Sequence, residues 1–382
     1  MRCSVRALDL LRRDRLRILL PVAAATLLFV GLSAVGTFVP ASHLTTPARG
    51  GIPDTAAKPQ PPAAVAYDSP RPTTDPAAPG TFIGFGGDQT DPFVLAENGT
   101  YFLFTSRQAP GAGPNVPVRA ANVVGRWGPV TDALPQLPVW AEPGWAWAPD
   151  VHRFGDDDVL YFTALVRGSS PATMCIGAAV GTRITGPYMA LPAPIVCQFL
   201  AGGSIDPRTF MDKDGQAYLL WKSDENAVSP VTPTRIYSQP LSADGLLLLS
   251  RAAQIFGPDE SWQGDIVEAP DLVQVAGAYF LFYSGYWFNQ PGYAIGVASC
   301  AGPLGPCADT SPAPLLRSNE QGTGPGEESV FADPRGIWLL YAPFHSSFVP
   351  FLTPPRPATV ARLGFDGAGV YLAATPSVPG DT

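Results

Sequence analysis

Three acidic residues stand where segments that read as β-strands begin, and a proline follows each within two positions. They are Asp91 in Thr-Asp-Pro-Phe, Asp206 in Ile-Asp-Pro-Arg and Glu268 in Val-Glu-Ala-Pro. A carboxyl group in a partly dry cleft favours its neutral form and can act as a general acid, whereas an ionised carboxylate can act as a base. For one such segment alone, a solvated surface carboxylate is the simpler interpretation. The recurrence of the pattern favours a shared site.

The segments that carry these residues belong to a repeat. Five stretches share a polar or acidic opening, a strand, a Gly- or Asp-rich turn and an aromatic-rich strand, and their openings lie roughly 60 residues apart, the length of a four-stranded blade. Aligned on these openings, the equivalent residues are Asp91, Asp150, Asp206, Asp271 and Val330. We therefore predict an all-β fold, a five-bladed β-propeller. The alternative is a β-sandwich with coincidental hairpins.

A propeller would bring the three carboxyl groups to one place. The innermost strand of each blade lines the axis, so residues that open these strands meet at one end of the channel. Carboxylates that lie close together cannot all ionise freely, and the last to lose its proton becomes an acid near neutral pH. An acid, a base and a third carboxyl that tunes them suit inverting glycoside hydrolysis, with room for a water between acid and base.

The blade openings resemble those of family 43 glycoside hydrolases, five-bladed propellers that act on arabinofuranosides and xylosides. The motifs that carry the resemblance are Asp91-Pro92, Trp147-Ala148-Pro149-Asp150, Ile205-Asp206-Pro207, Glu268-Ala269-Pro270 and Gly324-Pro325-Gly326 before Ser329-Val330. Each motif is weak alone, but the five occur in order at one-blade spacing over about residues 83–375. The resemblance implies that Asp91 is the general base, Asp206 the modulator of the acid and Glu268 the general acid.

The sequence departs from the family pattern in its last repeat. Glu327 follows the Gly-Pro-Gly where the family often has a histidine, and Tyr341-Ala342 stands where a Tyr-His is common. In relatives a histidine of blade five can face a central calcium or a water, and His345 is the nearby imidazole here. A core histidine bonded to the backbone is the alternative. We expect no cofactor, because chemistry by three carboxyl groups needs none.

Several residues near the blade openings are candidates for binding substrate. A sugar can stack its C–H face on an aromatic ring, and the alternative role for such rings is hydrophobic packing between blades. The candidates are Trp147, Trp262, Tyr286 and Trp287, with Trp145 nearby. Arg208 follows Asp206 closely and is expected either to bond a sugar hydroxyl or to pair with a carboxylate.

The chain begins with features of export. Six arginines precede an apolar run from Ile18 to about Val39, which is long enough to span a bilayer, so residues 1–40 are a signal peptide or a signal anchor with its arginines in the cytoplasm. Residues 41–80, rich in Pro, Ala and Thr, read as a disordered linker. We assign residues 81–378 to the propeller. Cys175 with Cys197, and Cys300 with Cys307, are expected disulfides of an oxidising compartment.

Composition and missing motifs exclude other classes. The 382 residues include 44 Pro and 39 Gly with only 15% charged residues, which favours short strands and turns. The net charge of −8 argues against a nucleic-acid partner. With only His43, His152 and His345, no Cys/His cluster has zinc spacing, and neither a phosphate-binding Gly loop nor a Gly-x-Ser-x-Gly is present.

We therefore expect an exported inverting glycoside hydrolase of arabinofuranosyl or xylosyl bonds, acting on polysaccharide or oligosaccharide as a monomer. It would be secreted, or held on the membrane if the N-terminal segment is not cleaved. Two alternatives stay open. One is a non-catalytic propeller that binds wall polysaccharide, and the other is a retaining fructosidase-like enzyme, in which the Asp of the first blade is a nucleophile.

Overall fold

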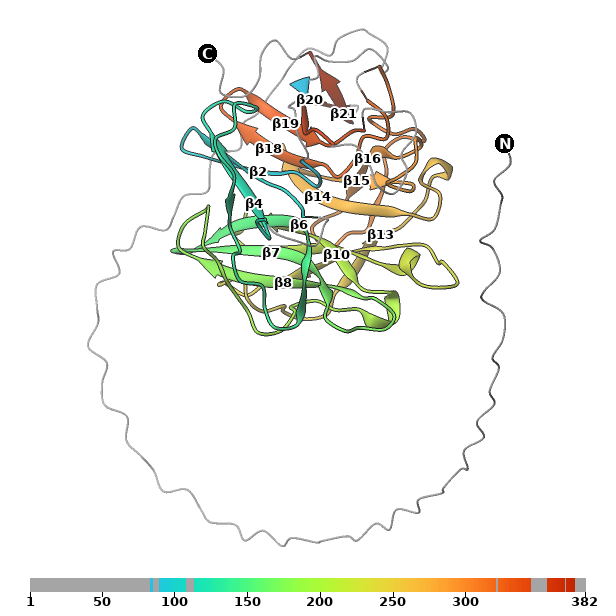
Figure 1. The fold of residues 1–382 in the computed structure, drawn as a ribbon. Helices are drawn as coiled ribbons and strands as arrows, with labels where there is room; N and C mark the ends of the chain where they lie inside the picture. Colours follow the sequence, from blue (N-terminus) through green and yellow to red (C-terminus); the bar gives the residue numbers. More distant parts are fainter. Residues whose placement is uncertain are drawn as a thin grey trace, which may run out of the picture. The chain divides into compact units, whose positions relative to one another are not determined.

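The computed structural model describes residues 83–84, 89–107, 113–320, 322–344, 356–367 and 369–374. In them the chain forms five antiparallel sheets, which are the five blades of the predicted β-propeller (Figure 1). Blade one contains β2 (Phe93–Glu97), β3 (Thr100–Phe104), β4 (Pro117–Ala121) and β5 (Thr131–Asp132). Blade two contains β6 (Ala141–Phe154), β7 (Asp157–Val166), β8 (Met174–Gly181) and β9 (Met189–Ala190). Blade three contains β10 (Ser204–Met211), β11 (Ala217–Ser223), β12 (Ile236–Pro240) and β13 (Ala253–Phe256). Blade four contains β14 (Val267–Val275), β15 (Ala278–Gly285), β16 (Ala294–Cys300) and β17 (Cys307–Asp309).

Blade five combines strands from both ends of the propeller sequence. It contains β18 (Ser329–Asp333), β19 (Gly336–Tyr341) and β20 (Thr359–Asp366) in order. The outer edge of β20 then pairs with two strands, β1 (Ile83–Gly84) near its start and β21 (Gly369–Ala373) further along. Because β1 precedes blade one in sequence, its pairing in blade five joins the first blade to the last.

The innermost strands contact one another in a closed circuit. Strand β2 contacts β6, β6 contacts β10, β10 contacts β14, β14 contacts β18, and β18 returns to β2. The start of each of these strands therefore lies at the same end of the propeller axis. Two-residue turns connect inner strands to their partners, as at Asn98-Gly99 and Ala276-Gly277, where all four φ angles are positive. Such turns match the twist of the paired strands.

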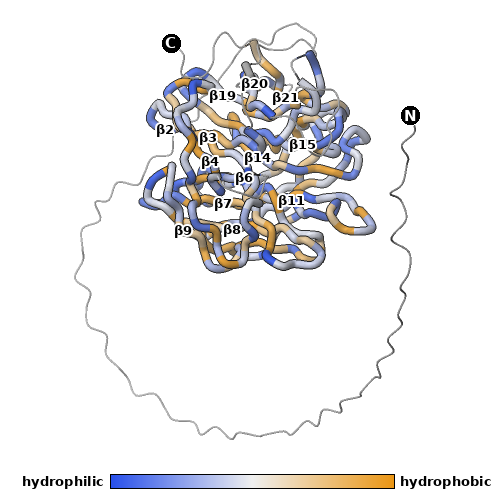
Figure 2. The backbone as a smooth tube through the Cα atoms, viewed as in Figure 1, coloured by the Kyte–Doolittle hydropathy of each residue, from blue (hydrophilic) through white to orange (hydrophobic). Residues whose placement is uncertain are grey.

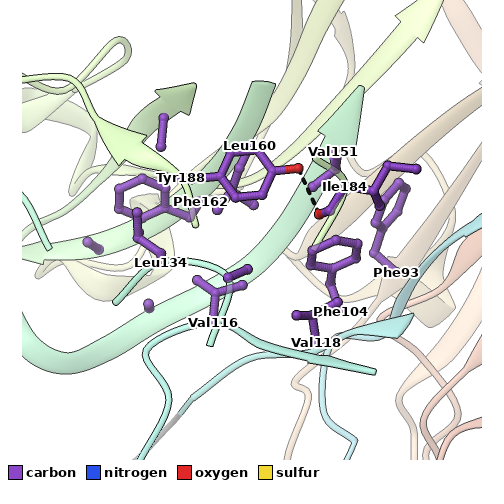
Figure 3. Close-up of a cluster of buried hydrophobic side chains, with 14 of the residues drawn as sticks. Phe93, Phe104, Val116, Val118, Leu134, Val151, Leu160, Phe162, Ile184 and Tyr188 are labelled. Carbon is purple, nitrogen blue, oxygen red and sulfur yellow. Dashed lines mark hydrogen bonds between the residues drawn. The ribbon is translucent and has the colours of Figure 1, made fainter. Parts of the chain in front are cut away.

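Hydrophobic packing between blades holds the ring together. Each interface between neighbouring blades has its own cluster of buried apolar side chains. Figure 3 shows the cluster between blades one and two, where Phe93 and Phe104 face Leu160 and Phe162. Because both faces of a blade are covered, strands such as β7 read as nearly continuous apolar runs, and Figure 2 shows hydrophobic residues along the strands.

The predicted targeting segment (1–40) and linker (41–80) lie outside the described residues. None of the helices within the described ranges is long and apolar enough to cross a membrane.

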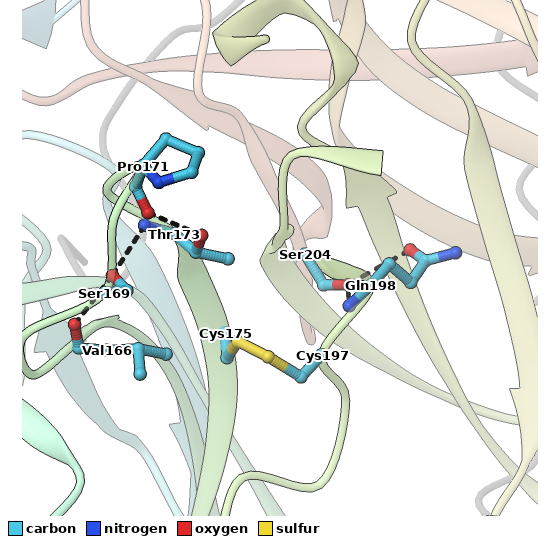
Figure 4. The surroundings of a disulfide bond; sticks show 8 residues. All are labelled: Val166, Ser169, Pro171, Thr173, Cys175, Cys197, Gln198 and Ser204. Atoms are coloured by element: carbon cyan, nitrogen blue, oxygen red, sulfur yellow. Dashed lines mark hydrogen bonds between the residues drawn. A yellow bond between two sulfur atoms is a disulfide. The ribbon is translucent and has the colours of Figure 1, made fainter. Parts of the chain in front are cut away.

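Both predicted disulfides are present. Cys175 in β8 is bonded to Cys197 in the segment that leads to β10 (Figure 4), and Cys300 in β16 is bonded to Cys307 in β17. The first closes a span of 22 residues and the second a span of 7. A cross-link stabilises a fold partly by restricting the unfolded chain, and more so for a longer loop.

We predict that the two disulfides contribute unequally to stability. The double variant Cys175→Ala/Cys197→Ala should lower the free energy of unfolding by about 3 kcal/mol, and Cys300→Ala/Cys307→Ala by about 2 kcal/mol. Urea unfolding followed by tryptophan fluorescence measures both. A larger loss for the shorter loop would contradict the loop-entropy explanation.

Candidate active site

One residue with a positive φ angle stands at the opening of every inner strand. These five are Asp91 (φ 48°), Ala148 (44°), Asp206 (55°), Ala269 (50°) and Glu327 (55°). The conformation is uncommon for residues other than glycine and persists only where the surrounding structure holds it. In blades two, three and four the pairing register shifts at this point, so the strand bulges there. All five residues line the same cavity of about 10 Å³, at one end of the axis.

This arrangement corrects the alignment of the repeats. The sequence analysis equated Asp91 and Asp206 with Asp150, Asp271 and Val330. The structure equates them with Ala148, Ala269 and Glu327, because the bulge sets Asp150 and Asp271 two positions further along their strands. The alignment on acidic residues therefore left Glu327 out of the site. In four blades the equivalent residue directly precedes a Pro, and in blade five Glu328 stands at the position of that Pro. The Pro was therefore the signal in the sequence that marks the equivalent positions.

Asp91 and Asp206 lie in the cavity as predicted. The hydroxyl of Ser106 donates to Asp91 Oδ2 and accepts a hydrogen bond from Ala148 N at 2.7 Å, which joins blade one to blade two at the site. Asp206 is buried, and its Oδ2 accepts from Ala269 N at 3.1 Å. Burial, together with the charges of Glu268 and Asp91, raises the pKa of Asp206 to about 8 against the opposing charge of Lys222. Asp206 therefore binds a proton more tightly than an ordinary aspartic acid does.

Glu268 directly precedes Ala269, the residue of blade four that is equivalent to Asp91 and Asp206. Its side chain therefore starts one position earlier along its strand than those of the two aspartates. It is 5% exposed, and Lys222 Nζ lies 2.9 Å from its Oε2. The same ammonium lies 3.4 Å from Asp224 Oδ1. Burial of Lys222 opposes its charge, but the charges of Glu268 and Asp224 raise the pKa of this ammonium above its ordinary value. The hydroxyl of Tyr293 lies 2.8 Å from Glu268 Oε1. Lys222 and Tyr293 had no motif in the sequence that marked them.

Glu327 is a fourth carboxyl group of the site. Its Oε1 lies 2.8 Å from the same Tyr293 hydroxyl, and its backbone N–H donates to Ser284 Oγ at 2.9 Å. Burial raises the pKa of Glu327 well above its ordinary value, and the charges of Asp91, Asp206 and Glu268 raise it further, while Arg356 opposes them. The residue that departs from the family pattern is thus part of the acidic cluster.

Arg208 pairs with carboxylates, which is one of the two roles expected for it. Its guanidinium pairs with Asp150 Oδ1 at 3.5 Å and with Asp271 Oδ2 at 3.6 Å, and it lies 4.9 Å from the centre of the Phe93 ring. Burial still raises the pKa of Asp271 to about 6. Arg208 also lines the cavity, so its ion pairs with Asp150 and Asp271 lie beside the site. A bond from Arg208 to a sugar hydroxyl stays a prediction.

The predicted aromatic residues occupy different environments. Trp262 stacks on Tyr283 at 5.9 Å and packs, partly buried, against the apolar cluster between blades three and four, and its binding to a sugar stays a prediction. Trp147 packs edge-on against Trp145 at 5.9 Å, and its Nε1 is buried without a hydrogen-bond partner. Tyr286 is half-buried beside Gly264 and Gly292. Trp287 is 39% exposed and lies in the loop between β15 and β16, at the same end of blade four as Glu268. It is the predicted aromatic most open to a ligand.

His345, the residue predicted to face a central calcium or a water, lies outside the described residues. In the described part of the chain, no group of three or more His, Cys, Asp or Glu side chains is arranged to hold a metal ion.

The fold and the site together define a class of enzyme: a five-bladed propeller whose axial cavity is surrounded by carboxyl groups suited to acid–base chemistry. The chain belongs to the glycosyl hydrolases family 43, whose family profile matches residues 85–364, and it is a glycoside hydrolase. The expected family membership and fold are thereby confirmed.

The sequences of individual relatives are only distantly similar to this chain. The extracellular endo-alpha-(1->5)-L-arabinanase 2 of Bacillus subtilis (strain 168) is 26% identical over 286 residues, which cover 65% of this chain and 56% of the relative. The chain thus spans little more than half the length of that protein. A thermostable family-43 glycoside hydrolase matches with a TM-score of 0.67 at 23% identity over 78% of this chain and 97% of that one. The alpha-L-arabinofuranosidase from Lactobacillus brevis matches with a TM-score of 0.63 at 18% identity over 77% and 96%. These structures share the fold.

The buried carboxyl groups predict how stability depends on pH. Burial raises the pKa of Glu328 to about 8, next to Ser284, which donates to its Oε2 at 2.6 Å. A carboxyl group with a raised pKa binds its proton more tightly in the folded state, so the free energy of unfolding falls as pH rises from about 4 to about 8. Glu328→Gln mimics the protonated form and should reduce this fall. Thermal unfolding at pH 5 and pH 8 measures it.

The matched control is Glu320→Gln at an exposed position. This variant should lose as much stability between the two pH values as the unmodified protein. If Glu328→Gln lost stability just as steeply, Glu328 would not retain a proton in the folded state.

Proposed function

We propose that this glycoside hydrolase cleaves arabinofuranosyl or xylosyl bonds in polysaccharide or oligosaccharide with inversion at the anomeric carbon. Asp91 acts as the general base on a water molecule, Glu268 as the general acid on the leaving oxygen, and Asp206 as the modulator that orients substrate. The observation that carries the proposal is that Asp91 and Asp206 line one cavity. Glu268 directly precedes Ala269, whose backbone N–H donates to Asp206 Oδ2.

The geometry supports a separate role for each carboxyl group. Asp91 is partly exposed, lines the cavity and accepts a hydrogen bond from the Ser106 hydroxyl, so a water molecule in the cavity would lie beside it. The cavity of about 10 Å³ has room for about one water molecule. Inversion requires a water between base and substrate, and the base takes a proton from that water as its oxygen attacks the anomeric carbon. Glu268 gives its proton to the departing oxygen.

The substrate class and the cellular location rest on other observations. The relatives named above include an arabinanase and an arabinofuranosidase, and the arabinanase is extracellular. Two disulfides agree with an oxidising compartment, and the arginine-rich apolar segment in residues 1–40 agrees with export. We therefore propose that the enzyme works outside the cytoplasm, secreted or tethered by that segment, as a monomer. Trp287 is the proposed stacking surface for a sugar.

The first test is hydrolysis by the full chain of p-nitrophenyl α-L-arabinofuranoside, p-nitrophenyl β-D-xyloside, dye-linked arabinan and dye-linked xylan. Asp91→Asn and Glu268→Gln should each lower turnover of the preferred polysaccharide by roughly 10²- to 10⁴-fold, because each removes a proton-transfer group. Asp265→Asn, an exposed carboxylate three positions before Glu268, should leave turnover unchanged.

NMR of the first product distinguishes the stereochemical course. Inversion gives the opposite anomer from the substrate, whereas retention would make Asp91 a nucleophile and overturn its role as base. If no substrate were turned over while polysaccharide still bound to all variants alike, this chain would have lost the activity of its family.

A further inference from the structure

A single tyrosine hydroxyl lies between two carboxyl groups of the site. Tyr293 Oη is 2.8 Å from Glu268 Oε1 and 2.8 Å from Glu327 Oε1. A phenol has one hydrogen, so it can donate to only one of the two carboxyl groups. At neutral pH the phenol keeps this hydrogen, because burial and the nearby carboxylates raise the pKa of Tyr293 well above its ordinary value. The second contact is a hydrogen bond only if the other carboxyl group is protonated and donates to the phenol oxygen.

The surroundings identify which carboxyl group carries that proton. Glu268 forms an ion pair with the ammonium of Lys222, which lies 2.9 Å from its Oε2. Glu327 faces Asp91 from blade one, Asp206 from blade three and Glu268 from blade four, and Arg356 is the cation that acts on it. The guanidinium of Arg356 donates to the carbonyl oxygen of Ala342 at 2.6 and 3.0 Å. The arrangement is therefore a neutral Glu327 that donates to Tyr293, which donates to an ionised Glu268.

We propose that Glu327 and Tyr293 form a proton relay that supplies the proton of the general acid Glu268. In the step, the Tyr293 hydrogen moves to Glu268 Oε1 while the Glu327 hydrogen moves to Tyr293 Oη. Glu268 becomes neutral, Tyr293 stays neutral and Glu327 becomes a carboxylate, so charge and protons balance. Glu268 then gives its proton to the leaving oxygen, and solvent returns a proton to the pair after turnover. The relay rests on the proposed role of Glu268.

The relay explains how a residue beside a lysine can serve as an acid. On the side of blade three Glu268 pairs with Lys222, which also lies 3.4 Å from Asp224, so the proton that Glu268 transfers reaches it from the side of Tyr293. Sharing the proton with Glu327 keeps one proton in the pair over the working range, because two interacting groups titrate as a unit. Glu327 and Tyr293 act through Glu268, so they are positioning residues for its proton.

The backbone around the relay fixes its geometry. The ring of Tyr293 is fully buried, and a Cβ atom on Gly326 would lie 2.0 Å from Tyr293 Cε1. Gly326 is therefore a glycine because the tyrosine ring fills the space beside it. Ser284 Oγ accepts from Glu327 N at 2.9 Å, which fixes the start of the Glu327 side chain. The Gly-Pro-Gly before Glu327 thus serves the placement of Tyr293.

The test compares Glu327→Gln, Tyr293→Phe and Glu268→Gln in the full chain. Each is assayed on an unactivated oligosaccharide of the preferred linkage and on the corresponding p-nitrophenyl glycoside. A poor leaving group needs the acid and a nitrophenolate hardly does. The two relay variants should therefore lose at least about 10-fold in kcat/KM on the oligosaccharide, and less than about 3-fold on the aryl glycoside. In Glu327→Gln the alkaline limb of the pH profile on the oligosaccharide should also move to lower pH by at least about one unit.

Tyr161→Phe is the matched control, since Tyr161 is a buried tyrosine of blade two whose hydroxyl donates to the carbonyl of Gly245. Circular dichroism and thermal unfolding check that every variant folds. Equal losses on both substrates would show that Glu327 and Tyr293 hold the substrate or the site's shape, and would overturn the relay. So would kinetics and a pH profile like those of the control. If Glu268→Gln itself kept its activity on the oligosaccharide, the proposed acid would be wrong and not only the relay.

Discussion

The concentration of carboxyl groups on the propeller axis is the constraint on which the rest of the site depends. Among the described residues, seven carboxyl groups lie in or beside the axial cavity: Asp91, Asp150, Asp206, Glu268, Asp271, Glu327 and Glu328. Lys222, Arg208 and Arg356 supply the cationic charge that acts on them. Carboxylates in such excess cannot all stay ionised in a dry interior. Some must keep protons, and an enzyme that transfers protons needs such a store.

Rigid packing makes this charge arrangement tolerable. The carboxyl groups belong to inner strands, or to the residues directly before them, and these strands are packed on both faces by neighbouring blades. Asp91, Asp206 and Glu327 each have a positive φ angle and line the cavity. Backbone strain and charge repulsion both oppose the folded state, and the five apolar interfaces offset them. The strands that carry the site are thus held in place by packing against both neighbouring blades.

The sequence predicted the fold because its signals are local and repeated. Aromatic-rich strands and short turns recur once per blade, and the disulfide partners are close in sequence. The same pattern predicted that Asp91, Asp206 and Glu268 lie near one another, since each lies at or close to the start of an inner strand. It missed Glu327 because a bulge changes which residue is equivalent in each blade, and hydrophobic patterning does not record that change. Tyr293 and Lys222 were beyond prediction, since they reach Glu268 through contacts between distant parts of the chain.

The closure of the ring has a consequence for inactivation by heat. Strand β1 contributes only Ile83 and Gly84 to its pairing with β20, and Gln89 adds a bond from its backbone N–H to the carbonyl of Arg356 at 2.9 Å. Asp91 and Glu327 belong to the two blades that meet at this seam. A brief parting of blades one and five would separate base from relay while every sheet stayed intact. Warming would then inactivate the enzyme reversibly at temperatures where its circular-dichroism spectrum is still that of a folded protein.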